Sequence, residues 1–163
     1  MDNYLTFRLG PSTLGMEIGT AVEVVTPRGV KPIPEMPEHI AGIMKIRREL
    51  IPLIDMRVRL SVSPEPKKER AIIVRSAAGK VGLVVDEVFG IRKFEKGGLR
   101  KPPVIFRGLK RKYLAGLYGD GEDMIVVLDM DEILTSEDKL ILESLIKKAA
   151  QAGKKKKARK GKA

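Results

Sequence analysis

Residues 41–56 have the sequence AGIMKIRRELIPLIDM, and residues 115–130 have the sequence AGLYGDGEDMIVVLDM. The two stretches align without a gap: Ala, Gly, Asp and Met recur at the ends, and Ile51 matches Ile125 between them. Residues 15–18 (GMEI) likewise match residues 82–85 (GLVV). We call these the first match and the second match. Because both run in the same chain order, they predict two homologous halves. Each has about 65 to 70 residues, a size that is only marginally stable by itself.

Short apolar runs separated by glycine, proline and charged residues occur along the whole chain, as is typical of β-strands. Several runs alternate between apolar and polar residues, which predicts one buried and one solvated face. The spacing leaves no room for the crossover helices of a βαβ fold. The expected strands are residues 4–9, 15–25, 50–54, 71–74, 81–88 and 124–128, with turns at 12–13, 78–80 and 119–121 and a single helical turn at 37–44.

One long helix is expected near the C-terminus, over residues 136–151. Thr135 or Ser136 can cap its start, an apolar stripe can pack on the strands, and Gly153 ends it. The sequence therefore predicts a mainly all-β fold with two pseudo-repeated subdomains, roughly residues 15–70 and 75–135, plus this helix. The subdomains would share a hydrophobic seam, and two rigid units that meet at a seam leave a groove in which ligands and partner segments bind.

The net charge of +11 is concentrated at the C-terminus. Residues 153–163 contain seven Lys or Arg and no acid, which leaves 25 basic against 21 acidic residues in residues 1–152. A tail of Lys, Gly and Ala has nothing to bury, so we expect it to be disordered. Three interpretations of this tail stay open: a solubilising end, weak contact with anionic lipid, and non-specific contact with nucleic acid.

The composition argues against several classes of protein. The chain has no Cys, which excludes disulfides, thiolate metal sites and thiol nucleophiles. No apolar run approaches the about 18 residues that cross a bilayer, and the polar N-terminus is unlike a secretory signal, so we expect a cytoplasmic protein. No phosphate-binding loop, nucleophile elbow or Ser-His-Asp order is visible. We therefore expect no enzyme, no cofactor, no metal and no small-molecule substrate.

Some polar residues invite a chemical role but have a simpler structural one. Asp55 and Asp129 occupy the same place in each repeat, which favours hydrogen bonding at strand ends over a catalytic pair. His39 is the only histidine, and we expect it at the surface or at a cap. Residues 119–123 lack the ligand spacing of a calcium loop and predict a hairpin turn. A structural role is also expected for residues 86–87, an Asp-Glu pair within a strand.

Residues 42–56 resemble the signature of the CheW family of chemotaxis coupling proteins, Gly-Val-x-Asn-Leu-Arg-Gly-x-Ile-x-Pro-x-Ile-Asp-Leu. Residues 15–24 (Gly-x-Glu-Ile-x-x-x-x-Glu-Val) and residues 81–88 look like two further landmarks of that family, and the likeness spans roughly residues 3–135. The Asn-Leu-Arg-Gly core of the signature is Lys-Ile-Arg-Arg at residues 45–48 here. Arg48 lacks the freedom of glycine to adopt a positive φ, so the local turn is expected to differ.

The resemblance implies a CheW-like domain over residues 1–152, built as two intertwined five-stranded barrels of Src-homology type. It also implies a function: an adaptor that couples transmembrane chemoreceptors to the histidine kinase CheA by non-covalent binding, in arrays at the inner face of the membrane. The cytoplasmic hairpin tip of methyl-accepting chemoreceptors would pack into the groove between the subdomains. One barrel, taken as the first, would meet the regulatory domain of the kinase.

The resemblance assigns receptor binding to six positions: Ala21, Glu23, Gly42, Arg47, Val85 and Val88. Arg47 matches the signature arginine, and a guanidinium suits such a contact because it binds a carboxylate through two hydrogen bonds while its plane packs on apolar groups. Outside the motif it would be one more solvated charge. Two other functions are kept as alternatives: a coupling domain of a larger signalling protein, and a basic nucleic-acid-binding protein built on small barrels.

Overall fold

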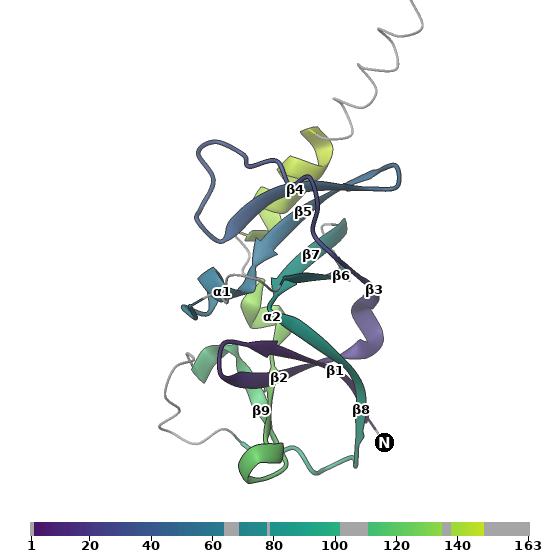
Figure 1. The fold of residues 1–163 in the computed structure, drawn as a ribbon, viewed down its shortest axis with the longest axis vertical. Helices are drawn as coiled ribbons and strands as arrows, with labels where there is room; N and C mark the ends of the chain where they lie inside the picture. The colour runs from purple at the N-terminus through teal and green to yellow at the C-terminus, as the bar shows by residue number, and fades with distance from the viewer. Residues whose placement is uncertain (1, 64–68, 78, 102–110, 135–137, 149–163) are drawn as a thin grey trace, which may run out of the picture.

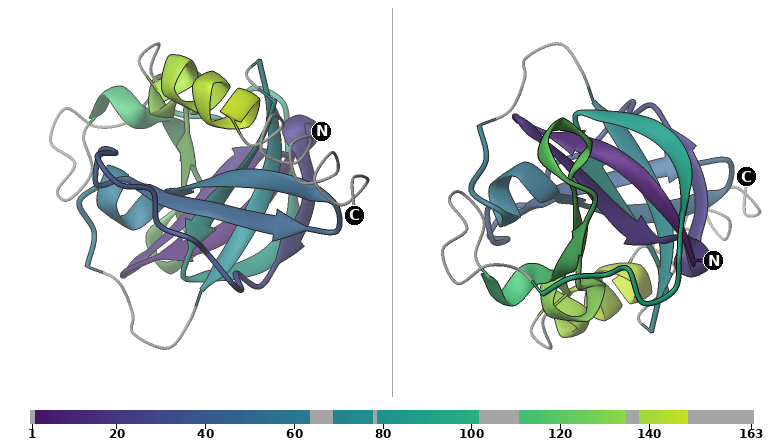
Figure 2. Two further views of the ribbon diagram at one scale, coloured as in Figure 1. Left: turned by 90° about the horizontal axis from the view of Figure 1, so that it is seen from above. Right: turned by 90° about the horizontal axis from the view of Figure 1, so that it is seen from below.

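The computed structural model describes residues 2–63, 69–77, 79–101, 111–134 and 138–148 (Figure 1). The first five-stranded sheet consists of β1 (Asp2–Leu9), β2 (Ser12–Glu17), β8 (Glu87–Phe94), β9 (Leu114–Tyr118) and β10 (Ile125–Leu128), in the order β8-β1-β2-β10-β9. The second consists of β3 (Ala21–Val25), β4 (Ile40–Ile46), β5 (Glu49–Asp55), β6 (Arg70–Ser76) and β7 (Gly79–Val85), in the order β3-β6-β7-β5-β4. Both sheets curl (Figure 2). We call them the β1–β2 barrel and the β4–β5 barrel.

Short helices connect the strands. They are η1 (Ile18–Thr20), α1 (Met56–Arg59), η2 (Arg111–Tyr113), η3 (Gly121–Asp123) and α2 (Met130–Ile133). Residues 138–148 form the described part of the C-terminal helix. The mainly β fold with two five-stranded units and a C-terminal helix is therefore confirmed. The ends of the expected helix, residues 136–137 and 149–151, and the basic tail at 153–163 lie outside the described residues.

The sequence repeat is reproduced at the level of strand register. The β1–β2 hairpin pairs Leu9 with Ser12, and the β6–β7 hairpin pairs Ser76 with Gly79; the two pairs occupy equivalent positions when the second match is extended along the chain. Two backbone hydrogen bonds of 2.8 Å, from Asp55 to the His39 carbonyl and from Asp129 to the Tyr113 carbonyl, are equivalent under the first match. The two matches therefore identify equivalent strands in the two halves.

Each barrel contains one parallel strand pair, and this pair requires a glycine. Gly15 on β2 lies beside Val127 on β10, and Gly82 on β7 lies beside Leu53 on β5, at equivalent positions. A Cβ on Gly82 would collide with the Leu53 side chain, and one on Gly15 would approach Ile125 to 3.1 Å. The glycines that begin the second match are thus explained by close approach of neighbouring strands.

The two halves of the chain exchange their first hairpins. The β1–β2 hairpin joins β8, β9 and β10 from the second half, and the β6–β7 hairpin joins β3, β4 and β5 from the first. Sheet membership therefore differs from the subdomain boundaries of 15–70 and 75–135. The crossings between the barrels are short: the links after β2 and β7 are only residues 18–20 and residue 86.

Several expected elements need correction. The helical turn at 37–44 is wrong, because residues 40–46 form β4, whose pairing with β5 buries Ile40 and Met44. The expected strands at 15–25 and 81–88 each contain a crossing between barrels and are two strands apiece. The hairpin turn at 119–121 is confirmed, as residues 119–124 connect the antiparallel strands β9 and β10. Of the turn at 78–80, residue 78 is not among the described residues.

The largest apolar cluster lies between the barrels and under the C-terminal helix, and this confirms the seam. It takes residues from both sheets, including Phe7, Met16, Leu83 and Val85, and Leu142 from the helix.

The two barrel interiors differ. The β4–β5 barrel is filled by an aliphatic cluster around Leu53. The β1–β2 barrel is filled by three rings: Phe94 stacks on Tyr118 at 4.4 Å, and Tyr4 meets both edge-on. Burial raises the pKa of the Tyr4 hydroxyl.

A buried charge network joins the barrels. Arg57 on α1 is 4% exposed; its Nε is 2.9 Å from Asp55 and its Nη2 is 2.6 Å from Glu69. Its Nη1 lies 3.6 Å from Asp86, and the other oxygen of Asp86 accepts a 2.7 Å hydrogen bond from the Gly10 amide of the β1–β2 turn. Burial by itself lowers the pKa of Arg57, but hydrogen bonds to Asp55 and Glu69 outweigh burial and raise it. The expected structural role of Asp86 is confirmed.

We predict that Gly82→Ala destabilises the protein by about 1–3 kcal/mol, because the added methyl group collides with Leu53 inside the barrel. Gly19→Ala is the matched control: nothing lies within 4 Å of its added Cβ, and the change should stay within about 0.5 kcal/mol. Urea unfolding measures both. Equal midpoints for the two variants would contradict the close-approach explanation.

We predict that Arg57→Ala costs about 3–5 kcal/mol, because it leaves the fully buried Asp86 carboxylate without its cation. The control is Lys80→Ala, which removes an exposed pair with Glu49 and should cost at most about 1 kcal/mol. A double-variant cycle with Asp86→Ala, followed by urea unfolding, should show the double variant less destabilised than additivity requires. Strict additivity would mean that Arg57 and Asp86 do not stabilise each other.

Candidate functional site

Four large apolar side chains are exposed on β3 and β8, the two strands that follow the crossings. They are Val22 (38% exposed), Val24 (41%), Phe89 (53%) and Ile91 (58%). When the second match is extended along the chain, Val22 is equivalent to Phe89 and Val24 to Ile91. Both strands lie at an edge of their sheet and on the same side of the molecule, at the right of Figure 1. We call these four residues the apolar strip.

Two β-bulges turn the strip outward. On β3, Ala21 pairs with Val74 and Glu23 with Ile73, so Val22 is an extra residue without a partner. Thr6 and Phe7 of β1 pair with Gly90 and Val88 of β8, so Phe89 is likewise extra. A bulge shifts the in–out alternation and redirects side chains. The same irregularity in both halves shows that exposure of Val22 and Phe89 is built into the repeated fold.

A third pair of equivalent bulges explains the repeated Ala-Gly of the sequence. Ala41 is the extra residue between the Ile40 and Gly42 pairs, and Ala115 is the extra residue in the equivalent place on β9. A Cβ on Gly42, whose φ is 144°, would collide with the Lys31 carbonyl. Gly42 is buried and serves backbone packing.

Arg47 and Glu23 form a forked ion pair beside the strip. The two guanidinium Nη atoms donate hydrogen bonds of 2.9 and 3.0 Å to the two Glu23 oxygens. Arg47 lies in the two-residue turn after β4, and Glu23 lies on β3, so the pair links the two outermost strands of the β4–β5 sheet. The Arg47 side chain stays 74% exposed. The hydrogen bond to Glu23 raises the pKa of Arg47.

As expected, Arg48 does not adopt a positive φ. Arg47 has a φ of 53°, and it is the residue of this turn that adopts the left-handed conformation. Left-handed backbone is costly for a residue with a side chain, so the arginine is held there by its surroundings. The fork to Glu23 supplies part of that restraint.

The structure brings together some of the six predicted receptor-binding residues. Glu23 lies on β3 between the strip residues Val22 and Val24, Ala21 directly precedes Val22, and Arg47 reaches Glu23 from the turn. Val88 is half-buried on β8, next to Phe89. Val85 is fully buried in the seam, and it supports this surface from beneath without reaching it. Their assignment to receptor binding stays a prediction.

Sequence reasoning missed the four residues of the apolar strip. Alternation along one strand predicts that Val22 and Val24 face the core, because it cannot register a bulge. A comparison of the two halves contained the signal. In the alignment of the second match, apolar Val22 and Val24 recur as apolar Phe89 and Ile91 on the equivalent strand.

Other candidate polar residues have structural roles. Asp55 and Asp129 cap α1 and α2 by accepting hydrogen bonds from backbone amides, which confirms their equivalent strand-end role. His39 is half-buried, with 16% of its side chain exposed, and its Nε2 lies 2.6 Å from the buried Asp138 of the C-terminal helix. Arg59 lies 3.1 Å from the other oxygen of Asp138. These contacts fasten the helix to the strands.

Within the described ranges, no group of three His, Cys, Asp or Glu side chains is arranged to hold a metal ion. No helix in this part of the chain is both long and apolar enough to cross a membrane. What the described surface offers is a rigid apolar strip flanked by an arginine–glutamate fork. That combination is typical of a module that binds other proteins.

Two interlocked five-stranded units with an exposed strip on the strands after their crossings define a two-barrel binding module. The chain belongs to the CheW-like domain family, whose model matches residues 3–138. It is 28% identical over 148 residues to the chemotaxis protein CheW of Klebsiella aerogenes, covering 90% of this chain and 89% of that one. The CheW of Treponema pallidum is 26% identical over 140 residues, covering 82% of each chain.

A solved structure agrees with this family membership. The scaffolding protein TtCheW from Thermoanaerobacter tengcongensis superposes with a TM-score of 0.74 at 27% sequence identity. The match covers 84% of this chain and 90% of the scaffolding protein.

Proposed function

We propose that this chain is a chemotaxis adaptor that couples chemoreceptors to a CheA-type histidine kinase by non-covalent binding. The observation that carries the proposal is the apolar strip on equivalent bulged strands, in a chain of the CheW-like family. A non-catalytic role follows from the same proposal, since the strip and the fork bind without making or breaking bonds. The proposal includes recruitment of the chain to receptor arrays at the inner face of the membrane.

The apolar strip is the proposed receptor site. Val22 and Val24 face solvent from one barrel and Phe89 and Ile91 from the other, so a helical hairpin lying across them would bury apolar surface from both barrels at once. Exclusion of water from such a patch supplies most of the affinity, and charges at its edge mainly affect rates and register. Arg47 and Glu23 are placed at that edge. The kinase regulatory domain is proposed to bind elsewhere on the barrels.

We predict that the double variant Val24→Glu/Ile91→Glu lowers affinity for the cytoplasmic fragment of a chemoreceptor from the same genome by about tenfold or more. The reason is that it places two charges in the surface to be dehydrated. Leu140→Glu is the control, since Leu140 is 68% exposed on the C-terminal helix, outside the strip. Isothermal titration against that fragment and against the kinase regulatory domain measures both partners.

Kinase binding retained by the double variant would show that the fold is intact and the strip is receptor-specific. If the unchanged protein bound neither partner, the proposed function would be wrong. If Leu140→Glu weakened receptor binding as much as the double variant, the strip would not be the receptor site.

We predict that Arg47→Glu weakens receptor binding and leaves the melting temperature nearly unchanged, because its ion pair with Glu23 is exposed to solvent. The substitution places a second carboxylate beside that of Glu23, so that the two repel each other at the edge of the strip. Lys101→Glu makes the same charge change away from it, next to Arg100, which pairs with Asp120 in the other barrel. Titration and thermal unfolding of both variants provide the comparison; equal receptor affinity for Arg47→Glu and the unchanged protein would remove Arg47 from the site.

A further inference from the structure

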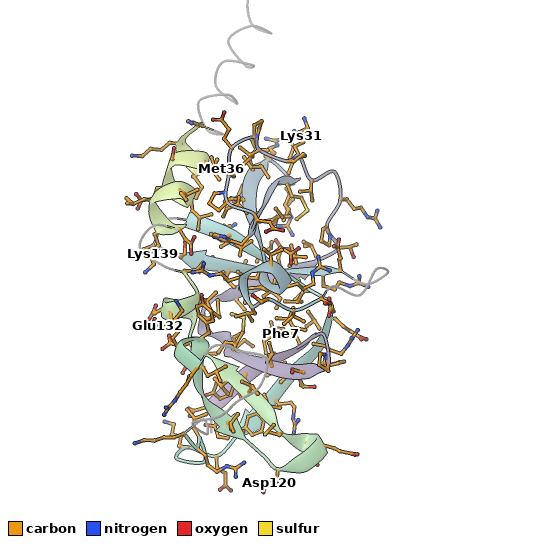
Figure 3. The ribbon with its side chains drawn as sticks, turned by 90° about the vertical axis from the view of Figure 1, so that its left-hand side faces the viewer. Phe7, Lys31, Met36, Asp120, Glu132 and Lys139 are labelled. Atoms are coloured by element: carbon orange, nitrogen blue, oxygen red, sulfur yellow. The ribbon has the colours of Figure 1, made fainter. Side chains whose placement is uncertain are left out.

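We propose that the turn end of the β4–β5 barrel is a docking surface for an acidic segment of the same protein partner that covers the apolar strip. This inference rests on the proposed function and adds the chemistry of the partner. The surface consists of six cations around β4 and its turn: Arg28, Lys31, Lys45, Arg47, Arg48 and Lys80. We call it the basic end. In Figure 3, Lys31 marks it at the top of the molecule, far from Asp120 at the bottom.

Backbone contacts bring the basic end together from separate segments. Lys31 and Ile43 exchange two backbone hydrogen bonds of 2.9 Å, which lays the segment before β4 along this strand. The Arg28 amide lies 3.4 Å from the Met44 sulfur, further along the same edge. Residues 47–48 form the turn, and Lys80 on β7 reaches Glu49 just after it. The six cations therefore surround one end of one barrel.

Carboxylates do not balance this charge. Glu23 and Glu49 lie at this end, and both are already engaged, by Arg47 and Lys80 respectively. Within the described part of the chain, no carboxylate forms an ion pair with the four remaining cations, Arg28, Lys31, Lys45 and Arg48. Glu35 and Glu38 come later in the same loop, and Glu38 adjoins His39, whose carbonyl accepts a hydrogen bond from Asp55 at the opposite end of β4. Uncompensated cations of one sign attract an anionic partner.

The basic end also carries apolar surface and adjoins the strip. Lys45 pairs with Leu50, so their side chains share a face, and Leu50 is 38% exposed. The fork from Arg47 reaches Glu23, which lies between Val22 and Val24 on β3 with its side chain on the opposite face of the strand, so the turn and the strip meet at the same edge strand. A segment that buries the strip can therefore continue over the turn and meet cations interleaved with a leucine. This continuity assigns both surfaces to one partner.

The pattern fits a protein better than a nucleic acid or a membrane. All seven aromatic residues of the chain lie outside residues 21–85, so the basic end has no ring on which bases could stack. Its tip, residues 47–49, is Arg-Arg-Glu, and Leu50 beside it is a single partly exposed apolar side chain, in contrast to the row of large apolar residues that membrane-surface segments insert among lipids. A segment with Asp or Glu side chains along one edge and apolar side chains along the other complements both features.

The test is a charge reversal with a matched control. Lys45→Glu/Arg48→Glu reverses two unpaired cations at the basic end, and Lys96→Glu/Lys101→Glu makes the same change on exposed residues beside the other barrel, around Arg100, which pairs with Asp120. Each full-length variant is titrated against the cytoplasmic receptor fragment at 50 and 200 mM NaCl. We expect about tenfold weaker binding for the first variant at low salt and a flatter salt dependence, because the lost attraction is the part that salt screens. The control should change by less than about twofold.

A second arm changes the partner. Replacing Asp and Glu by Asn and Gln at the tip of the receptor fragment should weaken binding to the unchanged protein and have little further effect on the Lys45→Glu/Arg48→Glu variant. Normal receptor affinity of that variant, while the unchanged protein binds, would overturn this inference and leave the proposed function intact. So would an equal loss in the control variant, or a loss confined to the kinase regulatory domain. No receptor binding by the unchanged protein would instead sink the proposed function.

Two further probes separate the other possible occupants. Vesicles containing phosphatidylglycerol and a duplex DNA of random sequence are titrated with the same variants. If Lys45→Glu/Arg48→Glu abolished binding to either probe and left the receptor fragment unaffected, the basic end would be a lipid or nucleic-acid surface and the inference would be wrong.

Discussion

The parallel pairing of β5 with β7, and of β10 with β2, is the constraint on which the rest of the structure depends. Each pair joins the last strand of one half of the chain to a hairpin of the other half, so neither barrel can close without both halves. The pairing needs close backbone approach at Gly15 and Gly82. It commits the chain to cross between barrels after β2 and β7, which places β3 and β8 on the same side of the molecule. The candidate binding surface is a consequence of those crossings.

The exchange of hairpins between the two halves also makes the two barrels one rigid unit. Two units of about 65 residues each would be marginal alone, because too little of their surface is buried. Interlocking them produces one seam that takes apolar residues from both sheets and from the C-terminal helix. His39 and Arg59 fasten that helix through the buried Asp138. A partner that docks on the apolar strip therefore meets strands whose backs are held by a common core.

The two halves have also diverged, and the differences lie at the crossings and in the barrel interiors. The Arg57 network fills the crossing at residue 86, but the equivalents of Arg57 and Asp86 are Asp131 and Gly19, which form no such network. The equivalent place at the other crossing is instead a cavity of about 390 Å³ bordered by Thr20, Met130 and Lys139. One barrel interior became aromatic and the other aliphatic. The backbone register was kept because both parallel pairs depend on it.

The sequence by itself determined the repeat, the mainly β class and the family, and it predicted a site region that includes Glu23 and Arg47. These features follow from local patterns and from two matches in the same chain order, which need no knowledge of spatial neighbours. Only the tertiary structure decided which hairpin joins which barrel, because strand pairing between distant segments leaves the in–out alternation of each strand unchanged. It also decided that Val22 and Phe89 face solvent, since one extra residue in a bulge reverses that alternation without changing composition. The tertiary structure likewise decided that Val85 is buried and that His39 contacts Asp138, because each is packed against elements that are distant in the sequence.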